Sequence, residues 1–347
     1  MNIDQLRQEL TQFFKSEDFT LEQLVGGASR RKFFRIDFLK DSYFPVTSVV
    51  LMIIPQDAGR TFHDYVYLDY YFKRLKVSRP SVYEVSQERG WVFMDFVADP
   101  TVEQFLHTQP GKVLETLSRM VEVVHELQRK CRPERGCPAF QRRFDAEKYR
   151  FEFTFHLKGQ LLEKYFALNY DPKAVDFMVE TISQSLDLKN EIFVHRDFQS
   201  SNVFINPEST PTFKLIDFQD ARSGNPLYDV VACLWDSYLK VEPAQRWALM
   251  DKSRGLLEDM GIGWEDSTFE RLTRYTIIQR KLHDAGAFAY NFRRTGNTRY
   301  VGYIEPTLRM VLAEMAHFPE FDAVSRLLQK AADHPPVPVP PKSNPTA

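Results

Sequence analysis

The chain has 347 residues, of which 43% are hydrophobic and 14% aromatic, enough to fill the core of one large two-lobed domain or of two ordinary ones. Its 45 basic and 47 acidic residues nearly cancel, so the overall charge gives no pull toward nucleic acid or anionic lipid, and neither is expected as a partner. The longest strongly apolar run, residues 49–54, is far too short to cross a bilayer, so no membrane segment is expected.

The N-terminal segment lacks the basic start and the apolar stretch of a secretory signal, and it predicts an amphipathic helix instead. The cysteines are Cys131, Cys137 and Cys233, an odd number without a C-x-x-C pair. This pattern favours reduced thiols over a disulfide scaffold. Together these features predict a cytoplasmic protein.

The first hundred residues carry the patterns of a small sheet. Four segments alternate apolar and polar side chains or are rich in β-branched residues, as strands are. They are residues 34–38, 47–54, 82–85 and 91–97. Between the second and the third, residues 61–75 have the spacing and length of a helix. The sequence therefore predicts a largely antiparallel sheet with one helix packed on it.

Helical patterns dominate from residue 98 to about residue 330. Residues 112–130, for example, place their apolar side chains on one helical face. Three short apolar runs interrupt the helices, namely EIFVH, NVFIN and FKLIDF. Residues 331–347 are rich in proline and predict a disordered tail, with a protein-binding segment as the alternative.

The most informative segment is VHRDFQSSNVFINPESTPTFKLIDFQDA, which begins at residue 194. A His-Arg-Asp triplet ends at Asp197, Asn202 follows five residues later, and Asp217 ends an apolar run. Each residue alone would be ordinary loop polarity, but the joint spacing matches that of protein kinases. Phosphoryl transfer needs a carboxylate to orient and deprotonate the attacking hydroxyl, and oxygen ligands for magnesium. We therefore predict Asp197 as the catalytic base, with Asn202 and Asp217 as magnesium ligands.

HRDFQSSN and LIDFQDA, followed by YDV, resemble the aminoglycoside phosphotransferase and choline kinase superfamily. Protein kinases have Gly after Asp-Phe, where this chain has Gln219, and no A-P-E segment follows. Three stretches are similar to the bacterial kinases that phosphorylate N-acetylmuramate and N-acetylglucosamine at the anomeric hydroxyl in cell-wall recycling. They are GGASRRKFFRI, LIDFQDARSGNPLYDVVACLWDSY and IIQRKLHDAGAFAY with the later RYVGYIEPTL.

This resemblance spans residues 25–310 and implies an α+β, protein-kinase-like fold of two lobes. Residues 1–97 would form the nucleotide-binding lobe, a small antiparallel sheet plus one helix. Residues 98–330 would form a larger, mainly helical lobe for catalysis and acceptor binding. It further implies ATP and Mg²⁺ as cofactors and an amino sugar as the acceptor, which would become the sugar 1-phosphate.

The nucleotide contacts are expected in the first lobe. A glycine-rich turn whose backbone N–H groups would face the phosphates precedes the first predicted strand. It comprises Gly26, Gly27, Ala28 and Ser29. By position alone, the adenine hinge is expected at Asp95, Phe96 and Val97.

One position departs from the kinase pattern. Met52 stands where the strand should carry a phosphate-binding lysine, and the helix that follows has no obvious glutamate partner. The cations Arg30, Arg31, Lys32 and Arg35 lie close in sequence. We predict that Arg35, on the polar face of its strand, supplies the missing charge, and we count Arg30 among the nucleotide contacts.

Three residues are predicted to contact the acceptor, namely Gln199, Asp220 and Arg280. A plain surface role is the alternative for Asp220.

Residues 280–299 hold five basic residues and a histidine against the single Asp284. This balance favours a neutral or anionic acceptor, such as one with a lactyl carboxylate, over a polycationic aminoglycoside. A solvated basic face is the alternative. The aromatic residues there, which stack on a sugar ring or belong to the core, are Phe288, Tyr290 and Phe292.

Two further residues are expected to be structural. Asp229 should cap a helix or brace the catalytic loop, and His195 should be packed and hydrogen-bonded to backbone.

Two hypotheses remain beside the sugar kinase. One is a kinase of the same fold for choline, an amino alcohol or an aminoglycoside. The other, motivated by Met52, is a nucleotide-binding pseudokinase scaffold.

Overall fold

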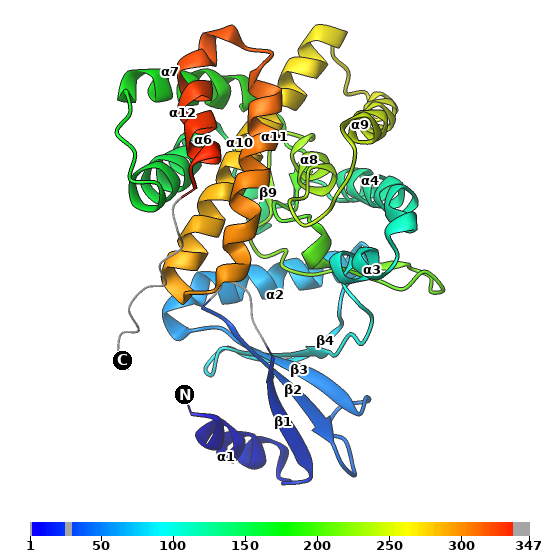
Figure 1. The fold of residues 1–347 in the computed structure, drawn as a ribbon. Coiled ribbons are helices and arrows are strands. Elements are labelled where there is room, and N and C mark those ends of the chain that lie inside the picture. Colours follow the sequence, from blue (N-terminus) through cyan, green and yellow to red (C-terminus); the bar gives the residue numbers. More distant parts are fainter. Residues whose placement is uncertain (1, 25–29, 336–347) are drawn as a thin grey trace. The chain divides into compact units, whose positions relative to one another are not determined.

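The computed structural model describes residues 2–24 and 30–335, so the Gly26–Ser29 turn and most of the proline-rich tail lie outside the described residues. The chain divides into two compact units (Figure 1). The first unit contains residues 1–100 and 203–220, and the second contains residues 101–202 and 221–347.

The first unit is built on a five-stranded antiparallel sheet in the order β1-β2-β3-β5-β4. Its elements are α1 (Ile3–Phe14), β1 (Phe19–Leu24), β2 (Lys32–Phe38), β3 (Ser48–Ile53), η1 (Gln56–Ala58), α2 (Gly59–Arg74), β4 (Val82–Ser86), β5 (Trp91–Asp95), β7 (Val203–Ile205) and β8 (Phe213–Leu215). The antiparallel sheet, four of its strands and α2 were predicted from the sequence. The edge strand β1 was not.

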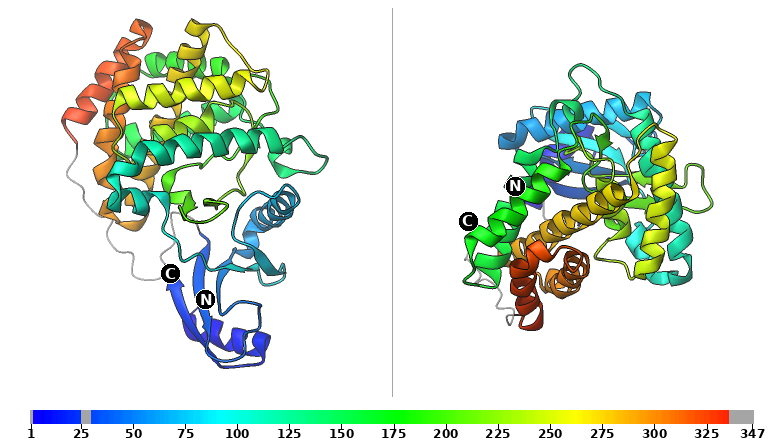
Figure 2. Two further views of the ribbon diagram at one scale, coloured as in Figure 1. Left: turned by 90° about the vertical axis from the view of Figure 1, so that its right-hand side faces the viewer. Right: turned by 90° about the horizontal axis from the view of Figure 1, so that it is seen from above.

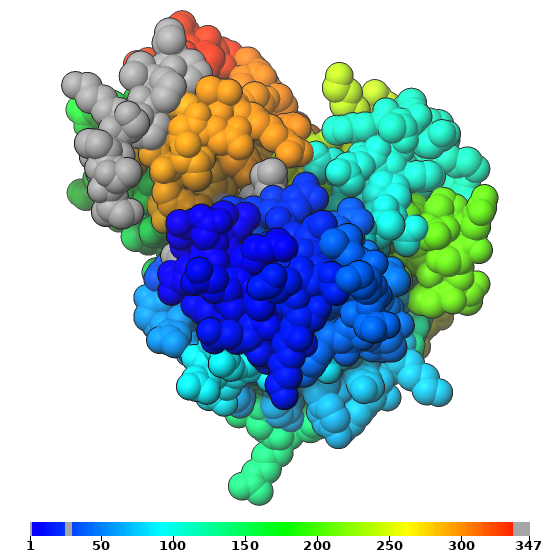
Figure 3. Space-filling model, turned by 90° about the horizontal axis from the view of Figure 1, so that it is seen from below, coloured from blue at the N-terminus to red at the C-terminus, as the bar shows by residue number. Residues whose placement is uncertain are grey.

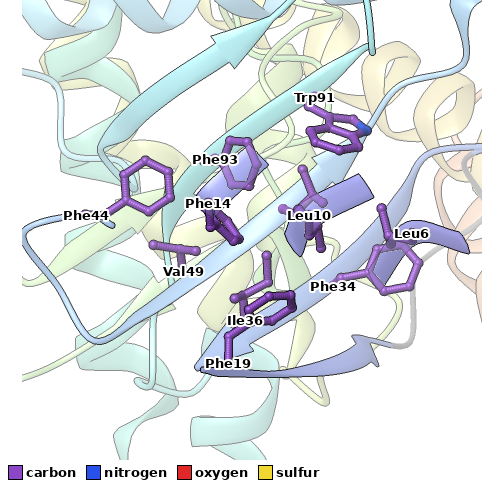
Figure 4. Close-up of a cluster of buried hydrophobic side chains, with 11 residues drawn as sticks. Leu6, Leu10, Phe14, Phe19, Phe34, Ile36, Phe44, Val49, Trp91 and Phe93 are labelled. Atoms are coloured by element: carbon purple, nitrogen blue, oxygen red, sulfur yellow. The ribbon is translucent and has the colours of Figure 1, made fainter. Parts of the chain in front are cut away.

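Helix α1 packs on one face of this sheet (Figure 4). Its buried residues Leu6, Leu10 and Phe14 recur every four positions and so lie on one side of the helix. They meet inward-facing strand residues such as Ile36 and Phe93 in one hydrophobic cluster. The outer side of α1, dark blue in Figure 3, faces solvent. The N-terminal amphipathic helix predicted from the sequence is therefore a structural cover of the sheet.

Met52 faces the opposite side of the sheet, because successive residues of a strand alternate between faces. It is 1% exposed and lies across from Phe33 of β2 and Val92 of β5. On the same face, the hydroxyl of Tyr65 in α2 lies 3.5 Å from the sulfur of Met94. The position that carries lysine in protein kinases is thus part of an apolar layer in this chain.

The polar turn between β4 and β5 ends at Gly90, which has a φ of 66°. A Cβ at this position would lie 2.2 Å from the carbonyl oxygen of Ile54. The backbone of Gly90 also accepts a hydrogen bond from the Ile54 N–H at 2.8 Å. Glycine is therefore required here both for its left-handed conformation and for the close approach of two backbones.

The second unit is mainly helical. Its elements are α3 (Val102–Thr108), η2 (Pro110–Lys112), α4 (Val113–Lys130), α5 (Pro138–Gln141), α6 (Ala146–Glu152), η3 (Phe153–Tyr165), α7 (Pro172–Leu186), β6 (Phe193–Val194), η4 (Ser200–Asn202), β9 (Arg222–Ser223), α8 (Tyr228–Leu234), α9 (Pro243–Glu258), α10 (Asp266–Thr295), η5 (Thr298–Tyr303), α11 (Ile304–Met315), η6 (Pro319–Phe321) and α12 (Asp322–Asp333). The small-sheet unit and this helical unit confirm the predicted α+β fold class.

Helix α10 organises the second unit (Figures 1 and 2). It is 30 residues long and packs against α7, α8, α11 and the π-helical segment η3. Gly286 lies where α10 meets η3, and a Cβ there would lie 2.3 Å from the carbonyl oxygen of His156. No helix among the described residues has the length and apolar character needed to cross a membrane.

We expect Gly286→Ala to lower the free energy of unfolding by about 1–3 kcal/mol, because the added methyl group must displace the backbone of η3. Gly255→Ala is the matched control. Gly255 lies within α9, and apart from its chain neighbours and the helix's own backbone, no atom lies within 4 Å of the position of its added Cβ. The control should be neutral or stabilising by up to about 1 kcal/mol, since alanine is the better helix former. Urea unfolding measures both, and equal effects would contradict the close-packing argument.

Candidate active site

The loop that carries Asp197 is held at its beginning by a buried carboxylate of α8. Asp229 accepts hydrogen bonds from the backbone N–H groups of His195, at 2.6 Å, and Arg196, at 2.9 Å. Burial raises the pKa of Asp229 to about 7, against the opposing effect of these two N–H groups. This is the bracing role predicted for Asp229. His195 is fully buried, and its ring packs edge-on against Phe198.

A second buried carboxylate holds the far part of the same loop. Asp236 accepts hydrogen bonds from the backbone N–H groups of Ser200, at 2.7 Å, and Tyr238, at 2.9 Å. Burial raises the pKa of Asp236 above its ordinary value. No pattern in the sequence singles out Asp236, because it lies two residues beyond Leu234, the last residue of α8.

Arg196 joins the loop to α6. Its guanidinium lies 3.3 Å from Oε1 of the buried Glu152 and 3.1 Å from Oδ2 of Asp197. The backbone φ of Arg196 is 81°, an uncommon conformation for a bulky side chain. The Asp229 carboxylate stabilises it through the N–H of Arg196 itself. Strained residues of this kind concentrate at functional sites, which agrees with the motif.

Asp197 lies between two guanidinium groups. Besides Arg196, Nη1 of Arg280 lies 3.6 Å from its Oδ1. Arg280 comes from α10, is 2% exposed, and donates to Oε1 of Gln199 at 3.2 Å. The Asp197 side chain keeps 18% of its surface exposed. The structure therefore brings together three predicted site residues, Asp197, Gln199 and Arg280, and leaves the carboxylate accessible.

Lys281, the next cation of the predicted basic segment, is buried and paired within the second unit, whereas Arg293, Arg294 and Arg299 are exposed. Oδ1 of Asp284 lies 3.2 Å from Nη2 of Arg280, and its Oδ2 lies 2.6 Å from Nζ of Lys281. Burial by itself would raise the pKa of Asp284, but these two cations hold it well below its ordinary value. Lys281 is fully buried and also donates to the carbonyl oxygen of Trp235 at 2.6 Å. This part of the segment is therefore not the solvated basic face considered above.

Asn202 closes the loop that carries Asp197 on itself. Its Nδ2 donates to the carbonyl oxygen of Asp197 at 3.0 Å, and its backbone N–H donates to the carbonyl oxygen of Gln199 at 2.9 Å. The side-chain amide is thereby fixed through its nitrogen. An amide oriented in this way presents its oxygen, the atom suited to a hard cation, on the other side.

Asp217 belongs to the first unit, where it follows β8. Its Oδ1 accepts hydrogen bonds from Nη2 of Arg31 and from Nε2 of Gln219, the latter at 3.0 Å. Oε1 of Gln219 in turn accepts from Nη1 of Arg31 at 2.9 Å. Gln219, which replaces the kinase glycine, thus joins the aspartate to a cation. Asp217 has a φ of 65°, and the next residue, Phe218, stacks on Tyr65 of α2 at 5.0 Å.

The other predicted cations of the first unit have different partners. Arg30 pairs with Asp57 at 2.8 Å, with both side chains more than 60% exposed. Arg35 donates to Oδ1 of Asp37 at 2.9 Å, and its guanidinium lies 4.0 Å from the ring centroid of Phe96. Arg35 and Phe96 are therefore adjacent. Arg31, which the sequence placed in the same cluster but did not choose, is the one that reaches Asp217.

The remaining predicted positions are placed as follows. The backbone N–H of Asp95 donates to the carbonyl oxygen of Ser81 at 2.9 Å, and its carboxylate accepts from the N–H of Ser81 at 2.8 Å. Val97 is half-buried beyond the end of β5. Oδ2 of Asp220 lies 3.4 Å from Nε2 of Gln219.

Within the described residues, no group of three or more His, Cys, Asp or Glu side chains could hold a metal ion.

The sequence profile of the phosphotransferase enzyme family matches residues 20–267. The chain belongs to this family. A relative named N-acetylmuramate/N-acetylglucosamine kinase, from Neisseria meningitidis serogroup B, is 25% identical over 312 residues, which are 85% of each chain. A relative of the same name from Pseudomonas aeruginosa is 30% identical over 141 residues, 40% of each chain. Family membership makes the chain a small-molecule kinase and implies ATP as its phosphoryl donor.

Solved structures of other kinases share the fold. Choline kinase LicA from Streptococcus pneumoniae superposes with a TM-score of 0.61 over 89% of this chain and 98% of that one, at 10% identity. The ternary complex of streptomycin, ATP and APH(2")-IIa gives a TM-score of 0.56 over 81% and 91%, at 16% identity. At these identities the similarity establishes the kinase-like fold and leaves the acceptor open.

Proposed function

We propose that the chain transfers the γ-phosphoryl group of ATP to the anomeric hydroxyl of an N-acetylated amino sugar, N-acetylmuramate or N-acetylglucosamine. The product would be the sugar 1-phosphate. The observation that carries this proposal is the accessible Asp197 carboxylate, held between two guanidinium groups on a loop that two buried carboxylates brace. The acceptor class is supported by the relative from N. meningitidis, which matches this chain over 85% of its length.

In the proposed reaction, Asp197 accepts the proton of the acceptor hydroxyl as the sugar oxygen forms its bond to the γ-phosphorus. The bond from that phosphorus to the bridging oxygen breaks, and ADP leaves. Arg196 and Arg280 hold the carboxylate in one orientation. Such positioning supplies much of the rate in phosphoryl transfer, because the protein has little covalent chemistry to do.

We assign Asn202 and Asp217 to Mg²⁺. One amide oxygen and one carboxylate are a suitable donor set, because Mg²⁺ keeps several waters and takes its other ligands from the phosphates. A cluster of three acidic or histidine side chains is not needed for such an ion. When bound, Mg²⁺ neutralises charge on the phosphate oxygens.

The guanidinium of Arg31 is the cation that we now propose beside the phosphates. It hydrogen-bonds Asp217 and Gln219, whereas Arg35 is engaged with Asp37 and Phe96. Arg31 would therefore supply the positive charge that Met52 cannot, and this favours an active kinase over a pseudokinase scaffold.

An acceptor panel tests the proposal. The purified protein is incubated with ATP, Mg²⁺ and either N-acetylmuramate, N-acetylglucosamine, choline, ethanolamine or streptomycin, and ADP release is measured. We expect turnover of the amino sugars with an acid-labile sugar 1-phosphate as product. A phosphate on another hydroxyl, or turnover of choline alone, would reject the anomeric assignment. Binding of ATP without turnover of any acceptor would favour the scaffold.

A further inference from the structure

Three aromatic side chains form an exposed patch on the second unit, called here the aromatic patch. Phe151 of α6 is 58% exposed, and Phe155 of η3 and Tyr290 of α10 are each 37% exposed. The rings of Phe151 and Phe155 are nearly parallel, with centroids 6.2 Å apart, and Tyr290 meets Phe155 edge-on at 5.6 Å. Adjacent exposed rings of this kind mark a binding surface more often than scattered single ones do.

Two cations flank the aromatic patch. Nζ of Lys148 lies 4.8 Å from the ring centroid of Phe151, and the guanidinium of Arg294 lies 5.9 Å from that of Tyr290. The Lys148 side chain keeps 19% of its surface exposed. The patch therefore offers flat apolar faces beside positive charge, which suits an anionic ligand with an apolar face and disfavours a polycation.

The aromatic patch is connected to Asp197 through consecutive polar contacts within the second unit. Nζ of Lys148 lies 3.0 Å from Oε1 of Glu152, and the same oxygen lies 3.3 Å from Nη2 of Arg196. Arg196 in turn lies 3.1 Å from Oδ2 of Asp197. Three consecutive contacts thus link Lys148 to the proposed base.

We propose that Lys148 and the aromatic patch form the subsite for the non-reacting part of the acceptor, and that they select a sugar bearing a carboxylate. The apolar C–H face of the ring or its substituents would lie on Phe151 and Phe155, since aromatic faces bind such groups. The carboxylate would pair with Lys148. This inference rests on the proposed function and adds a preference for N-acetylmuramate over N-acetylglucosamine, because only the former carries the lactyl carboxylate.

The test compares KM and kcat of four variants on the two sugars at saturating ATP. Lys148→Met should raise KM for N-acetylmuramate about tenfold and KM for N-acetylglucosamine less than twofold. Phe151→Leu should raise KM for both sugars about fivefold, because the flat ring face is lost. Arg150→Met and Phe177→Leu are the matched controls. Arg150 lies on the same helix but pairs with Glu180, and Phe177 of α7 is 53% exposed outside the patch.

The outcomes separate this inference from the proposed function. If the wild type turns over neither sugar, the proposed function and this inference are both rejected. If it turns over the sugars but Lys148→Met raises both KM values equally, the carboxylate assignment is wrong. If Phe151→Leu behaves like Phe177→Leu in KM, the patch does not contact the acceptor. A change of oligomeric state in Phe151→Leu without a change in KM, measured by size exclusion with light scattering, would assign the patch to a second copy of the chain instead.

Discussion

Replacing Asp197 by asparagine is expected to lower kcat by about a thousandfold. Asparagine keeps the shape of the side chain but cannot accept the proton of the attacking hydroxyl, and general-base catalysis of this kind contributes about 10²–10⁴-fold. Positioning of the two substrates persists in the variant, so a slow residual reaction is expected. Steady-state ADP release and single-turnover formation of the sugar phosphate measure the chemical step.

The variant needs a stability control, because Asp197 neutralises the buried guanidinium of Arg280 and that of Arg196. Removal of one partner of such a pair destabilises a fold. Urea unfolding and ATP binding should therefore be measured beside the rates, with Asp251→Asn on the exposed side of α9 as the matched variant. A folded Asp197→Asn protein that binds ATP and retains more than a tenth of kcat would exclude Asp197 as the base.

Much of the fold could be predicted from local patterns in the sequence. Strands β2, β3, β4 and β5 and helices α2 and α4 have the periodicity of half-buried elements, and their sequence predictions are confirmed within a few residues. Strand β1 was missed because it is an edge strand. Only its first residue, Phe19, is buried, so the expected alternation is absent. Strand β9 has two residues, too few to carry any period.

Some residues of the candidate site lie close together in the sequence, and others lie far apart. Asp197, Asn202 and Asp217 belong to one linear motif, so their spacing alone singled them out. Their partners come from far along the chain. Glu152 is 44 residues from Arg196, and Arg280 is 81 residues from Gln199. Only the folded chain assigns such partners, since no local pattern links segments at this separation.

The choice between Arg31 and Arg35 illustrates this limit. Alternation along β2 correctly put Arg35 on a polar face, but it also put Asp37 there, two residues on. The two side chains pair at 2.9 Å, and that pairing was available from the i, i+2 spacing. Arg31 precedes β2 and is 186 residues from Asp217, so nothing local linked them.

Arg31→Met is accordingly expected to lower kcat/KM for ATP by about 10–100-fold. The variant loses the positive charge beside the phosphates, and one hydrogen bond to a charged group is worth about 1.5–3 kcal/mol, which corresponds to roughly this factor. It also loses its own hydrogen bonds to Asp217 and Gln219. Part of that loss will appear as a higher Mg²⁺ requirement if Asp217 no longer keeps its orientation. Arg35→Met is the direct comparison, because it removes the same charge from a neighbouring position engaged with Asp37 and Phe96.

The comparison decides between two ways of replacing the kinase lysine. If Arg31 replaces the kinase lysine, Arg31→Met should lower kcat/KM at least ten times more than Arg35→Met does. Adding Met52→Lys should not restore the activity of Arg31→Met, because position 52 lies in an apolar layer. A lysine buried in that layer would cost stability rather than restore charge at the phosphates. If Arg35→Met proves the more damaging variant, the phosphates lie against β2, and the Arg31–Asp217 pair serves only to hold the aspartate in its left-handed conformation.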